Sequence, residues 1–184
     1  MAQASFQGQS VFSASCRVSA MTEAVYDEAK KTWVLEKAEK PATPVTIKAD
    51  QVDKSQRVLV DKCIGTTLVI EGKVNGVSIM NCKDTNVIMN DVISTIEITE
   101  CKKVKFQING SCPSASIDKT DSCMAYLLSD EAKKCQISTS KHSDVQITFM
   151  KGEDPVEVPV PEQFVHTIQE DGSLKSVVSS LYSS

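Results

Sequence analysis

The sequence predicts an all-β protein built as a parallel β-helix, followed by a C-terminal β-hairpin extension. Three observations support this fold class. Apolar-x-apolar triplets recur nine or ten residues apart, Asn, Asp, Gly, Ser and Lys fill the intervals, and equivalent residues return at every second triplet. With 184 residues, the chain is long enough for one domain with a substantial core.

The triplets mark short strands, because alternation of apolar and polar residues is the period of a half-buried strand. They begin at Val58, Leu68, Val77, Val87, Ile96, Phe106, Ala115, Ala125, Cys135 and Val145. Every second triplet repeats after 19 to 20 residues, which we interpret as one coil with two strands. An antiparallel meander also spaces its strands evenly, but it does not require equivalent residues at every second strand. A parallel β-helix does, because its coils stack at roughly 4.8 Å.

Three cysteines mark one corner of the predicted coil. Cys63, Cys82 and Cys101 each lie five residues before a strand, so we expect them to stack as an inward ladder of small side chains. A redox role is the alternative. The chain has seven cysteines and no CxxC spacing, and an odd number without a signal-peptide pattern favours buried thiols over disulfides.

The same register divides the outward-facing residues between two faces. On one face we expect Val69, Ile88, Gln107, Tyr126 and Gln146, and on the other Ser78, Glu97, Ser116 and Gln136. The first face is the more apolar, which makes it a candidate contact surface.

Lysines gather in the turns at the cysteine corner. The predicted rim contains Lys62, Lys83, Lys102, Lys103, Lys105, Lys119 and Lys141. A solvated charged rim is one interpretation. Stacked like charges about 5 Å apart repel each other, however, which favours a rim that meets an acidic partner.

The two ends of the repeat differ from its middle. We expect residues 1–25 to be mostly disordered, and residues 26–150 to form the β-helix with an N-terminal cap that contains Trp33 as an apolar plug. Residues 151–184 are predicted to form a hairpin and dimerisation segment, with a turn at QEDGS. Because Pro159 and Pro161 cannot donate to a ladder, we expect their strand to be an edge of the sheet or an exit from the stack. This hairpin can cap its own stack or exchange with a second chain.

Composition excludes several classes of function. A net charge of −4 argues against a general nucleic-acid binder, and Arg17 and Arg57 are the only arginines. No segment approaches the ~20 apolar residues of a membrane span, so we expect a cytoplasmic protein without membrane insertion. His142 and His166 are isolated from each other and from the cysteines, so we predict no metal site, and the sequence suggests no other cofactor.

Three sequence pieces resemble the C-terminal actin-binding domain of the cyclase-associated protein family. They are KCIGTTLVIEGKVNGVSIMNCK, SIDKTDSCMAYLLS and VEVPVPEQF, and the resemblance runs from about Trp33 to about Val178. The resemblance implies a right-handed parallel β-helix that dimerises by exchange of its C-terminal hairpin. It also implies binding of monomeric actin, preferably with ADP bound, and faster replacement of ADP by ATP, without catalytic residues.

The resemblance and the polar turn positions together predict the site residues. The expected actin contacts are Lys62, Lys73, Asn75, Asn81, Lys83, Lys102, Lys103 and Lys119. The expected dimer contacts are Val156, Val158, Val160, Phe164, Val165 and Ile168.

Other functions fit the sequence less well. A GTPase-activating β-helix of the tubulin-binding cofactor C type needs an inserted arginine, and only Arg57 lies on the predicted solenoid, without that family's Gln-x-Arg setting. A carbohydrate-active β-helix needs paired acids, and the outward positions offer only Glu97. A passive dimeric scaffold is the remaining alternative.

Overall fold

The computed structural model describes residues 22–182, which form two long sheets and one separate hairpin. Sheet A runs in the order β1 (Val25–Asp27), β2 (Thr32–Glu36), β4 (Arg57–Asp61), β6 (Gly76–Met80), β8 (Thr95–Thr99), β10 (Ser114–Asp118) and β12 (Gln136–Ser140). Sheet B runs in the order β14 (Asp154–Pro159), β13 (Ser143–Lys151), β11 (Asp121–Leu127), β9 (Lys102–Ile108), β7 (Lys83–Met89), β5 (Thr67–Ile70) and β3 (Val45–Ile47).

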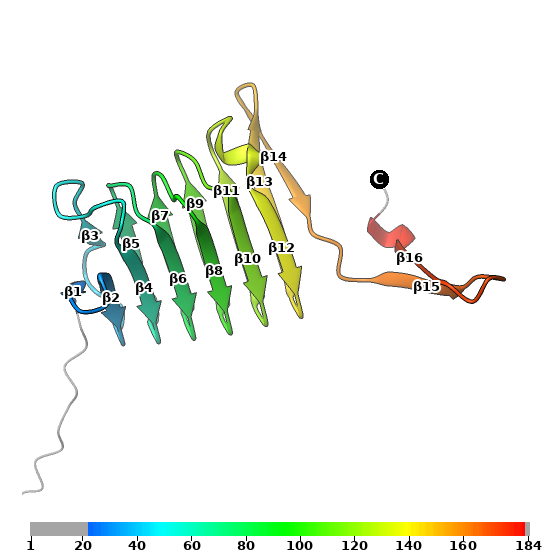
Figure 1. The fold of residues 1–184 in the computed structure, drawn as a ribbon, viewed down its shortest axis with the longest axis horizontal. Helices are drawn as coiled ribbons and strands as arrows, with labels where there is room; N and C mark the ends of the chain where they lie inside the picture. The colour runs from blue at the N-terminus through cyan, green and yellow to red at the C-terminus, as the bar shows by residue number, and fades with distance from the viewer. Residues whose placement is uncertain (1–21, 183–184) are drawn as a thin grey trace, which may run out of the picture.

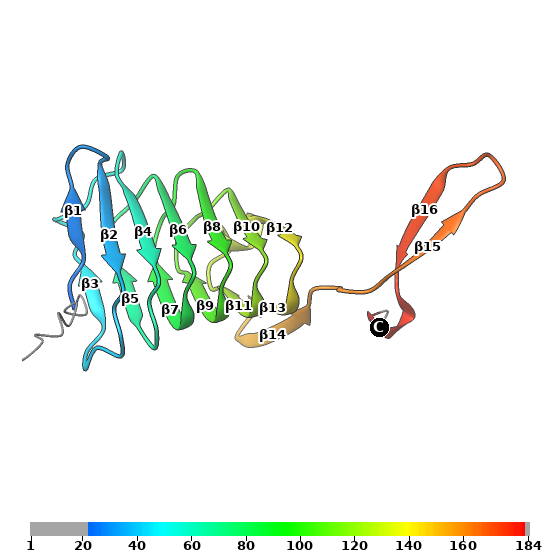
Figure 2. The ribbon, with the colours of Figure 1, turned by 90° about the horizontal axis from the view of Figure 1, so that it is seen from below.

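The chain alternates between the two sheets, so each coil contributes one strand to each of them (Figure 1; Figure 2). Within each sheet, the strands of successive coils pair in parallel. Leu68 pairs with Val87, Val87 with Phe106, and Phe106 with Ala125, so the step along the chain is the same each time. The structure therefore confirms the predicted parallel β-helix, with about six coils.

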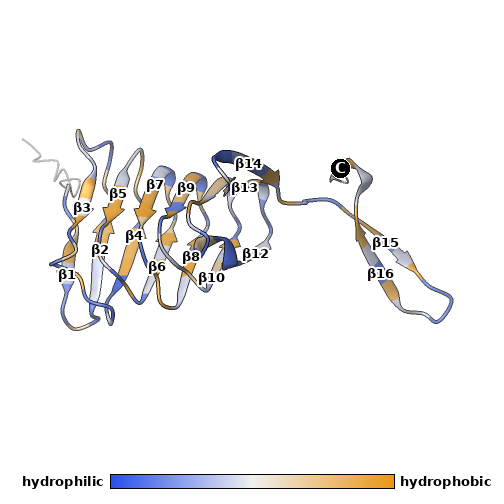
Figure 3. Ribbon diagram, turned by 90° about the horizontal axis from the view of Figure 1, so that it is seen from above, coloured by the Kyte–Doolittle hydropathy of each residue, from blue (hydrophilic) through white to orange (hydrophobic). Residues whose placement is uncertain are grey.

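The core lies between the two sheets and is formed by the inward residues of the triplets. Val77, Ile79, Leu68 and Ile70 are at most 1% exposed, as the alternation predicts. Phe106 is the largest of the fully buried side chains. Figure 3 shows the apolar residues concentrated on the strands of the solenoid and the polar residues in its turns.

The cysteine corner packs as the sequence predicts. Cys63, Cys82 and Cys101 are buried, and their thiols donate to backbone carbonyls of their own coil and the previous one. Thr85, three residues after Cys82, donates in the same way to the Cys63 and Lys83 carbonyls. Several of these carbonyls, such as those of Cys63 and Met80, also accept a backbone amide of a neighbouring coil, so the small side chains add a second hydrogen bond there. Cys16 lies outside the described residues.

The last coil is longer than the others, and this corrects the predicted register. A 3₁₀-helix, η1 (Ala132–Lys134), precedes β12, and Ala125 pairs with Ile147, a longer step along the chain than that from Phe106 to Ala125. Ser116 therefore lies beside Ser138 and Tyr126 beside Thr148, where we predicted Gln136 and Gln146 as neighbours. Gln136 and Gln146 still face outward as predicted, because a shift of two residues preserves the alternation. Their predicted pairing with Ser116 and Tyr126 is wrong.

The N-terminal end is closed by β1, which pairs with β2 in antiparallel orientation. Trp33 is half-buried and packs against the core at this end. Its indole nitrogen donates to the Gln56 side chain at 2.9 Å, and its ring lies 5.3 Å from that of Tyr26. Leu35, two residues later on the same strand, is fully buried. The expected disorder of residues 1–25 falls mainly outside the described range.

The C-terminal strands leave the solenoid in two steps. β14 pairs with β13 in antiparallel orientation and forms the edge of sheet B, with Pro159 as its last residue. The chain then crosses to the hairpin of β15 (Phe164–Ile168) and β16 (Leu174–Val178), followed by η2 (Ser180–Tyr182). This hairpin, which the QEDGS turn predicted, stands away from the solenoid (Figure 1; Figure 2). Between residues 22 and 182, no helix is long and apolar enough to cross a membrane.

Candidate functional site

Each full coil turns from sheet A to sheet B through a corner with two residues of left-handed backbone. The first position has φ between 47° and 54° at Lys62, Asn81, Glu100, Lys119 and Lys141. The second has φ between 49° and 60° at Gly65, Asp84, Lys103, Ser122 and Asp144. A non-glycine residue held there costs about 1 kcal/mol or more, which the surrounding ladder must offset. The corner therefore holds its outward side chains at repeated, defined positions.

Ion pairs occupy part of the predicted lysine rim. Lys102 Nζ lies 2.9 Å from Asp121 Oδ2, Lys119 Nζ lies 3.0 Å from Glu100 Oε1, and Lys62 pairs with Asp61 at 3.0 Å. The hydrogen bonds to these carboxylates raise the pKa of all three lysines above the usual value. Acidic residues alternate with the lysines, so the rim is not the continuous positive ridge that the sequence suggested.

Four lysines of the predicted rim have no ion pair among the described residues. Lys141 lies at the corner of the last coil, whereas Lys83, Lys103 and Lys105 lie on β7 and β9, and all four are exposed. Lys83 lies directly beside Lys102, whose charge is already offset by Asp121. The net positive charge of the corner is therefore concentrated on β7 and β9, at the middle of the solenoid.

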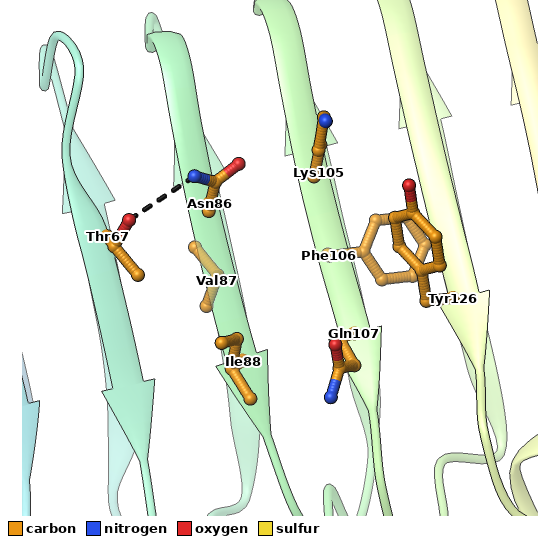
Figure 4. Close-up of a pocket in the computed structure, with 8 residues that line it drawn as sticks. All are labelled: Thr67, Asn86, Val87, Ile88, Lys105, Phe106, Gln107 and Tyr126. Atoms are coloured by element: carbon orange, nitrogen blue, oxygen red, sulfur yellow. Dashed lines mark hydrogen bonds between the residues drawn. The ribbon is translucent and has the colours of Figure 1, made fainter. Parts of the chain in front are cut away.

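The same two strands border a shallow hollow on the outer face of sheet B (Figure 4). It is lined by Thr67, Asn86, Val87, Ile88, Lys105, Phe106, Gln107 and Tyr126. Asn86 donates to the Thr67 hydroxyl at 3.2 Å, and Ile88, Gln107 and Tyr126 are neighbours across the sheet. A second hollow adjoins it at Asn86 and Lys105 and extends to Lys103 and Met124. Apolar, amide and ammonium groups therefore share one surface.

The predicted actin contacts fall into two groups on opposite edges of the solenoid. Lys62, Asn81, Lys83, Lys102, Lys103 and Lys119 lie at the cysteine corner. Lys73 and Asn75 lie in the turn that leads from β5 back to β6, at the other edge. There the Asn75 amide donates to the Gln56 carbonyl at 2.7 Å, and Lys73 borders a hollow with Glu131 and Lys134.

Two residues that line both hollows on sheet B, called here the sheet B surface, are not among the predicted contacts. Lys105 was placed in the rim but not among the contacts, and Asn86 was not singled out. Both are outward residues, and they lie two residues closer to the corner than Ile88 and Gln107. Extending the alternation of each triplet by two residues towards the corner finds them.

Arg57 is engaged within sheet A. Its Nη2 atom lies 3.5 Å from Glu97 Oε2, two coils further along, and Glu97 also accepts from the Ser78 hydroxyl at 2.9 Å. A Cβ at Gly76 would lie 3.5 Å from the Arg57 Cζ atom, which is an ordinary contact distance, so the guanidinium passes close to the backbone of β6. The guanidinium therefore lies along the sheet instead of projecting from it.

The C-terminal end of the solenoid exposes part of its core. A hollow there is lined by Leu127, Lys133, Cys135, Ile137, Ile147 and Phe149. β12 is the last strand of sheet A and, within residues 22–182, no further strand pairs with its outer edge. An uncovered edge and an apolar end are features that folded proteins normally cover.

The predicted dimer contacts divide between this end and the hairpin. Val156 and Val160 are half-buried, and Val160 packs against the core, whereas Val158 is exposed. In the hairpin, Phe164 is 48%, Val165 50% and Ile168 69% exposed. A two-stranded hairpin is marginally stable in isolation, so these apolar residues need a surface that covers them.

Comparison with known proteins identifies the family of this chain. Residues 22–181 match the family model described as "Adenylate cyclase associated (CAP) C terminal". The chain belongs to this family. Within residues 22–182 of this CAP domain, no group of three or more His, Cys, Asp or Glu side chains is arranged to hold a metal ion.

Individual relatives agree with the family match. The CAP domain is 36% identical over 149 residues to "Adenylyl cyclase-associated protein 1" of Homo sapiens, and 35% identical over 114 residues to "Adenylyl cyclase-associated protein 2" of Rattus norvegicus. These matches cover 80% and 62% of this chain but only 30% and 24% of the relatives. The chain therefore spans less than a third of their length.

A solved structure has the same architecture. The "Crystal Structure of Cyclase-Associated Protein from Cryptosporidium parvum" matches with a TM-score of 0.74 and 30% sequence identity. The match covers 85% of this chain and 99% of that one, so the two share nearly the whole fold.

Proposed function

We propose that this CAP domain binds monomeric actin, prefers its ADP-bound form, and accelerates the replacement of ADP by ATP. It would act in the cytoplasm as a regulator of actin turnover and not as an enzyme. Family membership supports the partner. The proposal needs no catalytic side chain and no cofactor, because actin itself holds the nucleotide.

The observation that carries the proposal is the mixed surface on β7 and β9. Lys83, Lys103 and Lys105 supply positive charge that no carboxylate of residues 22–182 offsets through an ion pair, although the whole chain has a net charge of −4. Ile88 and Tyr126 supply apolar area beside it. Such a surface suits a protein partner whose own surface is acidic, since complementary charge speeds encounter and apolar area contributes affinity.

The C-terminal end supports a homodimer. The hairpin presents Phe164, Val165 and Ile168 without a covering surface among the described residues of its own chain, and the solenoid end presents Ile137 and Phe149. In our proposal, the hairpin of one copy covers the end of a second copy, and the second copy does the same in return. Such a reciprocal exchange satisfies both surfaces at once.

Acceleration of exchange requires differential affinity. A ligand shifts a conformational equilibrium only by the difference between its affinities for the two states. We propose that the sheet B surface binds actin with a loosened nucleotide site more tightly than closed actin. The parallel ladders that hold this surface make it rigid, so the domain does not adapt equally well to both states.

The test is the release of a fluorescent ADP from actin monomers after excess ATP is added. We expect the full chain to increase the release rate in a concentration-dependent manner, and to bind ADP-actin more tightly than ATP-actin in native gels. Binding without any acceleration at micromolar protein would instead favour a passive scaffold. If the chain bound neither ADP-actin nor ATP-actin, the proposal would be contradicted.

A further inference from the structure

The chain contains a pair of thiols that the proposed function does not use. Cys112 precedes β10 and Cys135 directly precedes β12, and the Cys112 thiol donates to the Ser114 carbonyl at 3.1 Å. Both are thiols and not a disulfide in the structure. Unlike the corner ladder of Cys63, Cys82 and Cys101, this pair lies at the opposite edge of the solenoid.

The backbone register brings the two residues within disulfide reach. Ser114 pairs with Gln136, and the Gln136 amide donates to the Pro113 carbonyl at 3.0 Å, so Cys135 lies beside Pro113. Cys112 is therefore one residue diagonal to Cys135 on the neighbouring coil. With strands about 4.8 Å apart and a rise of about 3.3 Å, the two Cα atoms are roughly 6 Å apart, within the range that a disulfide spans.

The pair is also reachable from solvent on two sides. Cys135 is half-buried and borders the hollow at the C-terminal end of the solenoid. Cys112 is 3% exposed and borders the hollow that contains Lys73, Glu131 and Lys134. Small oxidants can therefore approach, whereas the Cys123 thiol is fully buried, and burial raises its pKa to about 12.

We infer that Cys112 and Cys135 form a reversible disulfide when the protein meets a hydroperoxide. The Cys112 thiolate attacks the peroxide oxygen and breaks the O–O bond, which gives a sulfenic acid at Cys112 and, with hydrogen peroxide, one molecule of water. The Cys135 sulfur then attacks Cys112 Sγ, forms the S–S bond and releases a second molecule of water. Two thiols are oxidised, one peroxide is reduced, and a dithiol reductant reverses the reaction.

The proposed disulfide would link the last two coils across the segment that contains η1. This segment lengthens the last coil, and β12 has a strand neighbour on one side only within the described residues. The bond therefore fastens a terminal strand of sheet A that is paired on one side only. A transient bond of this kind fits the cytoplasmic setting of the proposed function, where stable disulfides are rare.

Tryptic peptides make the test unambiguous. Reduced full chain is exposed to hydrogen peroxide, alkylated and digested, and Cys112 lies in the peptide 106–119 while Cys135 lies in 135–141. Neither peptide contains another cysteine. We expect these two peptides as a linked pair that dithiothreitol separates, and its absence while both thiols are alkylated or oxidised singly would overturn the inference.

Two matched variants and a second measurement complete the design. Cys135→Ser removes the linked pair, whereas Cys123→Ser leaves it. Oxidation is expected to raise the Tm of the wild type by roughly 5 °C and leave that of Cys135→Ser unchanged. Equal formation of disulfides among Cys63, Cys82 and Cys101 would contradict the claimed selectivity.

Discussion

The Lys102 ammonium of β9 lies 2.9 Å from the Asp121 carboxylate of β11, one coil further along the solenoid. Asp121 also accepts from the Ser143 hydroxyl at 2.6 Å, on the coil after that. Three successive coils are therefore connected at the corner by one carboxylate. The charge of Lys102 is therefore offset by a carboxylate. Lys83 and Lys103 differ from it, because they form no ion pair within the described part of the chain.

The Asp121 contact predicts a dependence of stability on pH. The Ser143 hydroxyl first and Lys102 second lower the pKa of Asp121 in the folded chain. A lowered pKa stabilises the fold above the unfolded value of about 3.9, and this stabilisation is lost as the pH falls through the folded value. Asp121→Asn should therefore be less stable than wild type at pH 7 and equal to it in strong acid, as measured by urea unfolding. Lys141→Gln, as the control, should show a constant difference across this range.

The solenoid core depends strongly on its largest side chain. Phe106 is fully buried between the two sheets, so Phe106→Ala leaves a cavity and should lower the free energy of unfolding by about 3–5 kcal/mol. Gln107→Ala, next to it on the outward face, should change this free energy by less than about 0.5 kcal/mol. Equal effects of the two changes in urea unfolding would contradict the inward and outward assignment.

Residues 48–56, the loop between β3 and β4 that we call the N-terminal loop, approach Gly72 too closely for a side chain at that position. A Cβ at this position would lie 2.2 Å from Val52 Cγ1 and 3.2 Å from the Ala49 Cα atom. Gly72→Ala should therefore lower the unfolding free energy by about 1–3 kcal/mol, and the additional change Val52→Ala should recover part of the loss. Lys73→Ala, at the neighbouring exposed position, is the control and should leave thermal unfolding unchanged.

In the proposed function, the lysines without an ion pair on β7 and β9 are the charges that actin contacts. Reversal of charge in the double variant Lys103→Glu/Lys105→Glu should weaken binding to ADP-actin by tenfold or more, which corresponds to roughly 1.4 kcal/mol. The variant Lys48→Glu/Lys54→Glu changes the net charge equally at the N-terminal loop and serves as its control. If both variants weaken binding equally in low-salt titrations, general electrostatic attraction explains the effect and the sheet B surface does not.

The exposed hairpin predicts a dimer in solution. Light scattering of the full chain should give twice the 20.0 kDa of one chain. Deletion of residues 163–184 removes the hairpin but keeps β14, and should give a monomer or an aggregating protein with an uncovered end. Replacement of Ile168, which is 69% exposed in the single chain, by Asp should shift the mass towards the monomer. A wild-type mass equal to that of one chain would exclude the proposed exchange.

The regular part of the fold was predictable because its cause is local. An inward residue such as Leu68 or Val87 must alternate with polar neighbours, and the stacking of coils must return it after one constant step along the chain. The register of the last coil was not predictable, because η1 adds residues to a turn without disturbing the alternation in Ile137 or Ile147. The alternation of inward and outward residues, which has a period of two, does not reveal that the turn before it has become longer.

The candidate site was predictable in composition but not in arrangement. The sequence shows that lysines concentrate at the corner, yet the spacing does not reveal that Asp121 offsets Lys102 or that Glu100 offsets Lys119. The sequence Gly-Lys-Val-Asn at residues 72–75 also does not show that Gly72 packs closely against a loop. Nor does it show that Lys73 lies at the edge of the solenoid opposite to the cysteine corner. Pairing of side chains across coils depends on three-dimensional neighbours, whereas a sequence contains only their separation along the chain.

The constant length of the regular coil also sets distances across the molecule. Because neighbouring strands are about 4.8 Å apart, the surface on β7 and β9 and the C-terminal end are separated by a whole number of such steps. The solenoid is thus a spacer, and the count of its coils fixes its length independently of the chemistry at either end. In a dimer joined at the C-terminal ends, that count would fix how far apart two bound partners are held.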